Sequence, residues 1–290
     1  MWIWLVLLYG VLKGAREICK KKALQTCSSV EVLLIYTLIA FLMVCPDAKN
    51  AMGMEPRFYF YVAIKSFIIF IAWIASFKAI KGIPLSLYGV LDLSRVLFAT
   101  TLGMVVLGER LGLLNVLGLV LVSAGLLLLK VIPAMSAKTG GKVVKEQVSV
   151  VLILLAFLSC LLNAVSGLMD KILTKYINSS QLQFWYMFFL VLFYAIYALV
   201  DRSKVDVKRA IKNKWIWILA AMFVVADRAL FIANSMQESQ VTVMTLVKQA
   251  GCVVTILAGK YIFKEKNTGY KFVCAAIVIA GIVLASVSTL

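Results

Sequence analysis

PLSLYGVLDLSRVLFATTLGMVVLGERL, residues 84–111, gives the first indication of the fold. It is long and apolar enough to cross the bilayer core, which takes about 20 residues of α-helix. It nevertheless carries Asp92 and Arg95 near its middle. A second stretch, QVTVMTLVKQAGCVVTILAGKYIFKEKN at 240–267, has the same outline and carries Lys248. Charged side chains at membrane depth are rare and usually face a cavity or a partner, so these stretches predict functional membrane helices.

The composition of the whole chain is that of a membrane protein. Of its 290 residues, 63% are hydrophobic and 15% are charged, whereas a soluble domain is about half apolar and about a quarter charged. The formal net charge of +17 would favour nucleic acid in a soluble protein. Here the basic residues lie mostly in short loops between apolar runs, so we expect a lipid bilayer and no nucleic acid as partner.

Apolar runs between charged or turn-forming residues predict ten membrane helices. They lie at about 2–22, 30–46, 58–80, 84–107, 112–130, 148–171, 179–200, 215–236, 241–262 and 270–289. The expected fold class is therefore an all-α membrane protein with ten transmembrane helices, which passes through the cell membrane many times. The Gly10-x-x-x-Gly14 spacing in the first helix suggests a close helix contact.

The chain divides at its longest polar segment. We expect a first five-helix repeat at 1–130, a basic linker at 131–147 and a second five-helix repeat at 148–290. Because five crossings is an odd number, the second copy enters the membrane from the opposite side. The repeats are therefore predicted to be inverted, as in many duplicated transporters.

A fixed offset of 156 residues relates the two halves. At this offset Glu109 aligns with Glu265, Gly103 with Gly259, and Gly125 with Gly281. Asp92 aligns with Lys248, so corresponding helices carry opposite charges.

The loops predict the orientation. The joints after odd-numbered helices hold eighteen Lys and Arg residues, and the other face holds four. Because Lys and Arg in short loops stay in the cytoplasm, we expect both termini outside and the linker inside.

Twelve charged residues lie at or near membrane depth, eight cations and four anions. From these we take as substrate-binding or gating candidates Lys65, Asp92, Arg95, Asp227, Arg228 and Lys248, and as coupling candidates Glu17 and Asp170. The surplus of cations favours a substrate with negative charge.

Several candidates have a simpler structural interpretation. Glu17 lies one turn after Lys13, so the two could neutralise each other near the interface. Asp92 and Arg95 could form an ion pair that joins helices. Lys65 has no opposite charge nearby in sequence. Asp227 and Arg228 are adjacent and diverge by about 100° around a helix, so one could bind while the other pairs elsewhere.

Two segments carry a family resemblance. GVLDLSRVLFATTLGMVVLGERLGLLNVLGLVLVSAGLLLL (89–129) and LAGKYIFKEKNTGYKFVCAAIVIAGIVLAS (257–286) resemble the signature region of EamA-type proteins of the drug/metabolite transporter superfamily. The matching marks are Gly-Glu-Arg at 108–110, Lys-Glu-Lys at 264–266 and the glycine-spaced helix that follows. Met169-Asp170-Lys171 is similar to an Asp-Lys pair common at that position in the family. The resemblance implies alternating access, with helices 1, 3, 4, 6, 8 and 9 around a central cavity and helices 5 and 10 in support.

These observations predict a secondary transporter for a small metabolite that is anionic or zwitterionic. A flippase for a lipid or lipid-linked head group and an exporter of cationic compounds remain alternatives on the same fold. An intramembrane enzyme is disfavoured because the chain has no histidine, which removes the commonest general base and metal ligand. We expect no cofactor and no metal. A homodimer is left open.

Overall fold

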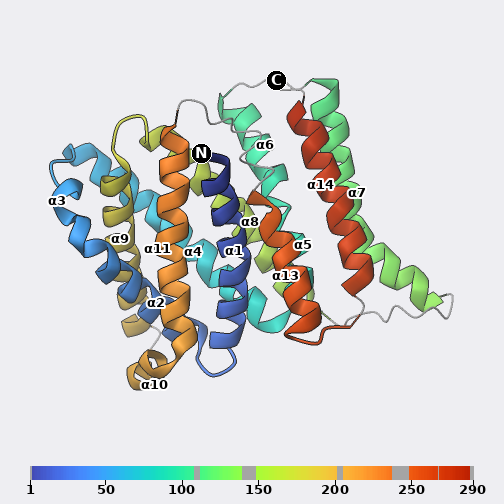
Figure 1. Ribbon diagram of the computed structural model, residues 1–290, viewed down its shortest axis with the longest axis horizontal. Helices are drawn as coiled ribbons and strands as arrows, with labels where there is room; N and C mark the ends of the chain where they lie inside the picture. The colour runs from blue at the N-terminus through green and yellow to red at the C-terminus, as the bar shows by residue number, and fades with distance from the viewer. Residues whose placement is uncertain are drawn as a thin grey trace.

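The computed structural model describes residues 2–107, 112–138, 148–200, 205–236, 248–266 and 268–287. Every regular element in these ranges is a helix (Figure 1). The predicted family marks Glu109 and Arg110 lie outside the described residues, and so does the start of the predicted ninth helix, 241–247.

The first half of the chain forms seven α-helices and one 3-10 turn. They are α1 (Trp2–Ala23), α2 (Ser29–Val44), η1 (Cys45–Asp47), α3 (Ala48–Ala51), α4 (Pro56–Gly82), α5 (Leu85–Asp92), α6 (Arg95–Leu107) and α7 (Leu113–Lys138). The second half forms α8 (Val150–Leu173), α9 (Ser179–Val200), α10 (Val207–Lys212), α11 (Lys214–Ser235), α13 (Ala250–Tyr261) and α14 (Thr268–Val287).

The protein is a multi-pass membrane protein. Six of the described helical segments are long and apolar enough to cross a bilayer, and two shorter apolar helices lie at Gly251–Tyr261 and Thr268–Leu284. Large apolar side chains are exposed on the outside of the bundle, with Leu113 76% and Leu199 80% exposed. Such a surface is stable only against lipid. The count of ten crossings stays a prediction.

Two predicted boundaries differ from the structure. The helix predicted at 84–107 is broken at Leu93 and Ser94, which form a turn between α5 and α6. The helix predicted to end at 130 continues as α7 to Lys138, so the first eight residues of the predicted linker are helical. Pro133 lies inside α7, and the alanines, methionine and lysine after it are good helix formers that sustain the last turns. Residues 139–147 lie outside the described part.

The two halves are inverted. α2 leads from the end of α1 to α3, so α3 lies at the end of the bundle where α1 begins (Figure 1). The chain after α8 reaches that same end, because the Asn178 side chain donates to Asn50 O at 3.4 Å and Gln181 donates to Met52 O at 3.3 Å. α8 therefore runs opposite to α1, as expected for inverted repeats.

The bundle has two chemically different ends. We call the end where α1 begins and α14 ends the terminal end, and the opposite end, where α4 meets α5 and α13 meets α14, the basic end (Figure 1). Lys20, Lys21 and Lys22 close α1 at the basic end, and α10 carries Lys208 and Lys212 there. The terminal end carries Lys49 and Arg57. The predicted charge bias therefore separates the two ends, while the compartment each one faces stays a prediction.

Matching capping boxes at the starts of two helices support the relation between the two halves. Ser28 and Glu31 form a capping box at the start of α2, with Glu31 N donating to Ser28 Oγ at 3.2 Å and Ser28 N to Glu31 Oε2 at 2.7 Å. Asn178 and Gln181 make the equivalent reciprocal bonds before α9, at 3.1 and 2.8 Å. Each box fixes where a helix enters. The two boxes are 150 residues apart in the sequence, whereas the later equivalent segments are 156 apart. The second half therefore has six additional residues between these points.

Glycines allow the two halves to approach closely. α1 crosses α13 where Gly14 faces Gly251: a Cβ on Gly14 would lie 2.6 Å from Gly251 O. α7 crosses α14 in the same way, because a Cβ on Gly281 would lie 2.7 Å from Gly118 O. Small residues let membrane helices pack backbone to backbone, so each crossing joins one helix of the first half to one of the second.

Replacing Gly14 with alanine is expected to destabilise the protein, because the methyl group has no room unless α1 and α13 separate. Overpacking of this kind costs about 1–3 kcal/mol. Gly167→Ala in α8 is the matched control, since no atom lies within 4 Å of a Cβ there and alanine favours a helix by about 1 kcal/mol. Thermal unfolding in detergent should show a lower Tm for Gly14→Ala alone. Equal melting of the two variants would contradict the packing argument.

Candidate functional site

Charged side chains gather around α1, which packs against α4, α5, α11 and α13 in the middle of the bundle (Figure 1). α1 carries Lys13, Arg16, Glu17 and Lys20 within two helical turns. The central position of α1 places charges from both halves of the chain within reach of it.

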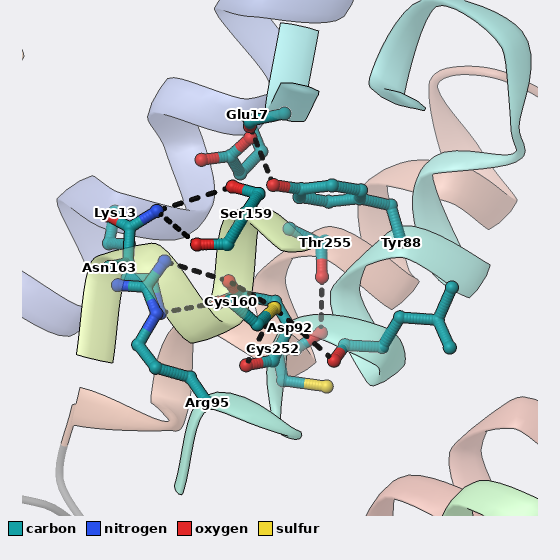
Figure 2. Close-up of polar contacts among 12 residues, drawn as sticks. Lys13, Glu17, Tyr88, Asp92, Arg95, Ser159, Cys160, Asn163, Cys252 and Thr255 are labelled. Carbon is teal, nitrogen blue, oxygen red and sulfur yellow. Dashed lines mark hydrogen bonds and ion pairs between the residues drawn. The ribbon is translucent and has the colours of Figure 1, made fainter. Parts of the chain in front are cut away.

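Asp92 is held by two cations. It is the last residue of α5, and its carboxylate lies 2.5 Å from Lys13 Nζ and 3.0 Å from an Arg95 guanidinium nitrogen. Figure 2 shows Lys13, Arg95 and Cys160 around Asp92, with Cys160 Sγ 3.8 Å from Asp92 Oδ1. The predicted Asp92–Arg95 pair is therefore present. The predicted Lys13–Glu17 pair is wrong: Lys13 reaches across to α5, and Glu17 pairs with Lys20 at 2.7 Å instead.

Asp227 and Arg228 diverge, as their adjacency on α11 predicted. Asp227 faces α1 and lies 3.3 Å from Arg16 NH1. Arg228 points away from α1 and binds Asp47 at 2.5 Å and Ser180 Oγ at 3.1 Å. Arg228 therefore joins α11 to η1 and α9, and the structure does not place it with the other candidates.

Lys65 is not solitary. Its Nζ lies 3.1 Å from Asp170 Oδ1, and the Lys65 side chain is 3% exposed. The ammonium group also lies 3.7 Å from the centre of the Tyr186 ring, close enough for a cation–π interaction. Two predicted site residues from opposite halves of the chain, one on α4 and one on α8, thus form one ion pair.

An aromatic cluster lies beside these pairs. Trp73 packs against Tyr36, Tyr186 and Phe223, with ring centroids 5.5, 6.4 and 5.4 Å away. The Arg16 guanidinium lies 5.1 Å from the centre of the Phe223 ring. Tyr36 and Tyr186 occupy equivalent positions at the 150-residue offset, so the two halves contribute matching rings.

Lys248 differs from the other interior cations. No carboxylate of the described residues lies within ion-pair distance of it, and its Nζ lies 5.9 Å from the centre of the Tyr9 ring. It is followed by a turn at Gln249, just before α13 begins. Asp92, its equivalent at the 156-residue offset, likewise adjoins the turn between α5 and α6. Interrupted helices that carry charge are the usual place for a substrate or ion site in transporters with inverted repeats.

Glu17 faces a small cavity between α1, α5 and α13. Lys13, Tyr88, Asp92 and Thr255 also line it, and it has room for about one water molecule. Glu17 Oε1 accepts from Lys20, while the buried Oε2 has no hydrogen-bond partner among the described residues. The carboxylate therefore keeps a free acceptor inside the bundle.

We call ten of these described side chains the interior charge network. Its cations are Lys13, Arg16, Lys20, Lys65, Arg95 and Lys248, and its anions are Glu17, Asp92, Asp170 and Asp227. The network carries two more formal positive than negative charges. The excess is concentrated where Lys13 and Arg95 share one carboxylate and at Lys248.

Sequence reasoning missed the roles of Arg16, Lys20 and Tyr9. Arg16 follows Lys13 by three residues and Lys20 follows Glu17 by three, which puts each pair on one helix face. That spacing could have indicated that one whole face of α1 is charged. The sequence around Tyr9 gave no indication that its ring lies beside Lys248.

A membrane bundle of two inverted halves, with charged side chains between broken helices, defines the class of membrane carriers. The chain belongs to the EamA-like transporter family, whose model matches residues 1–131 and 150–287. The protein is therefore a membrane transporter of the drug/metabolite transporter superfamily, a group of carriers and not of enzymes.

A solved structure has the same fold. It is described only as "Crystal structure of protein" and is 16% identical, with a TM-score of 0.66 over 99% of this chain and 96% of its own. At this identity the likeness supports the fold alone. No curated protein matches the chain.

Proposed function

We propose that this protein is a secondary transporter that carries a small anionic or zwitterionic metabolite across the cell membrane by alternating access. The observation that supports this most is the excess of two positive charges in the interior charge network, with Lys248 forming no ion pair among the described residues. A charge that is partly buried inside a membrane bundle without a counter-charge is costly. An acidic group on the substrate would supply the missing negative charge.

The geometry favours separate tasks for the predicted residues. In this proposal Lys248, Arg95 and Lys13 hold the acidic group of the substrate, with Asp92 positioning the two cations that it binds. The ion pairs Arg16–Asp227 and Lys65–Asp170 lie beside the aromatic cluster. There they would contact the remainder of the substrate, or would break when the protein changes conformation during transport. Arg228 has no place in this site, because its partners lie on η1 and α9.

An exporter of cationic compounds is the second candidate. The free Glu17 Oε2, buried in the small cavity, favours it, because an unpartnered carboxylate oxygen could accept a cationic group or a proton. Lys13 and Lys20 lie next to this carboxylate or line the same cavity, which opposes a cationic substrate. Glu17 and Asp170 remain candidates for ion coupling.

Counterflow in proteoliposomes tests the proposed function. Vesicles loaded with one unlabelled metabolite should accumulate its labelled form in a saturable manner, and the substrates that work should be carboxylates, phosphates or zwitterions. A thermal-shift screen would select the metabolites, since a ligand that binds the folded state raises its Tm. Counterflow of organic cations alone would favour the second candidate. Movement of labelled lipid between leaflets would favour a flippase.

A further inference from the structure

Glu265 is placed by a sharp turn at a helix end. α13 ends in a turn in which Glu265 N donates to Gly259 O, six residues earlier, at 2.9 Å. The intervening Lys264 has φ of 52°, a left-handed conformation that glycine adopts more easily than lysine. This geometry turns the chain sharply and aims the Glu265 side chain back toward α5.

The Glu265 carboxylate holds the start of α5. It accepts the backbone N–H of Leu85 at 2.5 Å, the backbone N–H of Ser86 at 3.0 Å, and the Ser86 hydroxyl. Lys21 of α1 lies 3.4 Å from the same carboxylate and donates to Ile83 O at 2.7 Å. We call this set of contacts the Glu265 clamp. It joins α1, the α4–α5 joint and the α13–α14 loop at the basic end.

The clamp is electrostatically favourable. The unsatisfied N–H groups of the α5 N-terminus attract an anion. Burial alone would raise the pKa of Glu265, but the bonds from Ser86 and Leu85 and the charge of Lys21 lower its pKa below the ordinary value. Glu265 is therefore ionised at physiological pH, and its hydrogen bonds are charge-assisted and stronger than neutral ones.

The clamp closes the route between the cavity and the basic end. From the cavity toward that end, α5 and α13 touch where Gly89 faces Thr255 and again where Gly259 faces Ser86. Tyr88, which lies on α5 between these two contacts and lines the cavity, is buried and its hydroxyl lies 2.7 Å from the Ser76 hydroxyl. A solute that leaves the cavity toward the basic end must part α5 from α13, and the Glu265 clamp resists that separation.

We propose that the Glu265 clamp is the gate of the basic end: it is formed while that end is closed and breaks in every transport cycle to open it. This gate rests on the proposed function, because only a carrier that works by alternating access needs to open the basic end. A weaker clamp is expected to shift the protein toward the state open at that end.

Labelling of Cys252 tests this gate. Cys252 lines the small cavity and is 6% exposed. The other five cysteines are replaced by serine or alanine, and a membrane-impermeant thiosulfonate is added to sealed vesicles on the side of the basic end. Glu265→Gln replaces a charged acceptor by a neutral one, so it is expected to speed labelling at least about tenfold. Glu55→Gln is the control, because Glu55 forms an exposed ion pair with Arg57 outside the clamp, and it should leave the rate unchanged.

The results distinguish a gate, which opens during transport, from a contact that only stabilises the fold. A Glu265→Gln protein that melts earlier but labels at the original rate would show that the clamp only stabilises the fold, and would overturn the gate. If that variant does not fold, Ser86→Ala keeps both backbone donors and removes the hydroxyl, which donates to Glu265 and accepts from Lys271 at 3.0 Å. Faster labelling supports the gate, and an unchanged rate opposes it. Because labelling needs no substrate, faster labelling without counterflow of any metabolite would keep the gate and alternating access, and would refute a small metabolite as the substrate.

Discussion

Lys248→Ala is expected to abolish counterflow while leaving the protein as stable as before. In the proposed site Lys248 makes a charge-assisted contact to the substrate, and such contacts contribute about 1.5–3 kcal/mol, or roughly 10- to 150-fold in affinity. No described carboxylate pairs with Lys248 in the protein itself. Removing a partly buried cation that has no counter-charge should therefore not lower the Tm. Loss of transport with an unchanged or higher Tm is the diagnostic combination.

Two comparisons complete this experiment. Lys260→Ala in α13 removes an exposed lysine near the basic end, and counterflow should remain. Asp92→Asn should lose both transport and stability, because it leaves Lys13 and Arg95 without their shared carboxylate. If Lys248→Ala and Asp92→Asn both transported like the unmodified protein, the assigned site would be wrong.

Lys65→Met is expected to destabilise the protein more than Gly14→Ala or Lys248→Ala. The substitution removes the counter-charge of Asp170, whose side chain is 25% exposed and would then face a buried methionine in place of an ammonium group. Breaking a buried ion pair by removing one partner costs about 3–5 kcal/mol. Replacing both partners, as in Lys65→Met with Asp170→Leu, should restore most of that stability, since apolar replacements of a buried pair are often neutral.

The double variant also separates structure from function. We expect it to fold and yet to show no counterflow, because the charges themselves are needed in the site. Arg57→Met is the matched control, since the exposed Arg57–Glu55 pair contributes about 1 kcal/mol or less. Unfolding in detergent gives the stabilities, and counterflow gives the activities. A double variant with full transport would show that Lys65–Asp170 is only a structural pair.

Predictions from local spacing are confirmed for two pairs of residues. The three-residue separation of Asp92 and Arg95 predicts that they lie close together, and the structure has them paired across the turn at Leu93 and Ser94. The 100° rotation between neighbours separates Asp227 from Arg228, which bind α1 and η1 respectively. Both relations concern residues at most three apart in the sequence, so no tertiary information is needed for them.

Predictions that require a partner from another helix fail. Spacing leaves Lys65 solitary because Asp170 lies on α8, more than a hundred residues later. Spacing also pairs Lys13 with Glu17, whereas the contact of Lys13 with Asp92 depends on how α1 crosses α5. The family mark Lys264-Glu265-Lys266 is visible in the sequence, but its contact with the start of α5 is not. In each case a distance between helices decides the partner, and sequence separation says nothing about it.

The amino-acid sequence alone is enough to predict a membrane transporter with two related halves. Hydrophobic length predicts where helices cross lipid, and a predicted count of five crossings per repeat implies that the repeats are inverted. Both predictions need only the chain taken one segment at a time. The packing of the helices determines which charges pair, that Lys248 has no described carboxylate beside it, and that Glu265 contacts the start of α5. These features depend on helix crossings made close by glycines such as Gly14, Gly251 and Gly259, because an ion pair forms only where packing brings two side chains within a few ångströms.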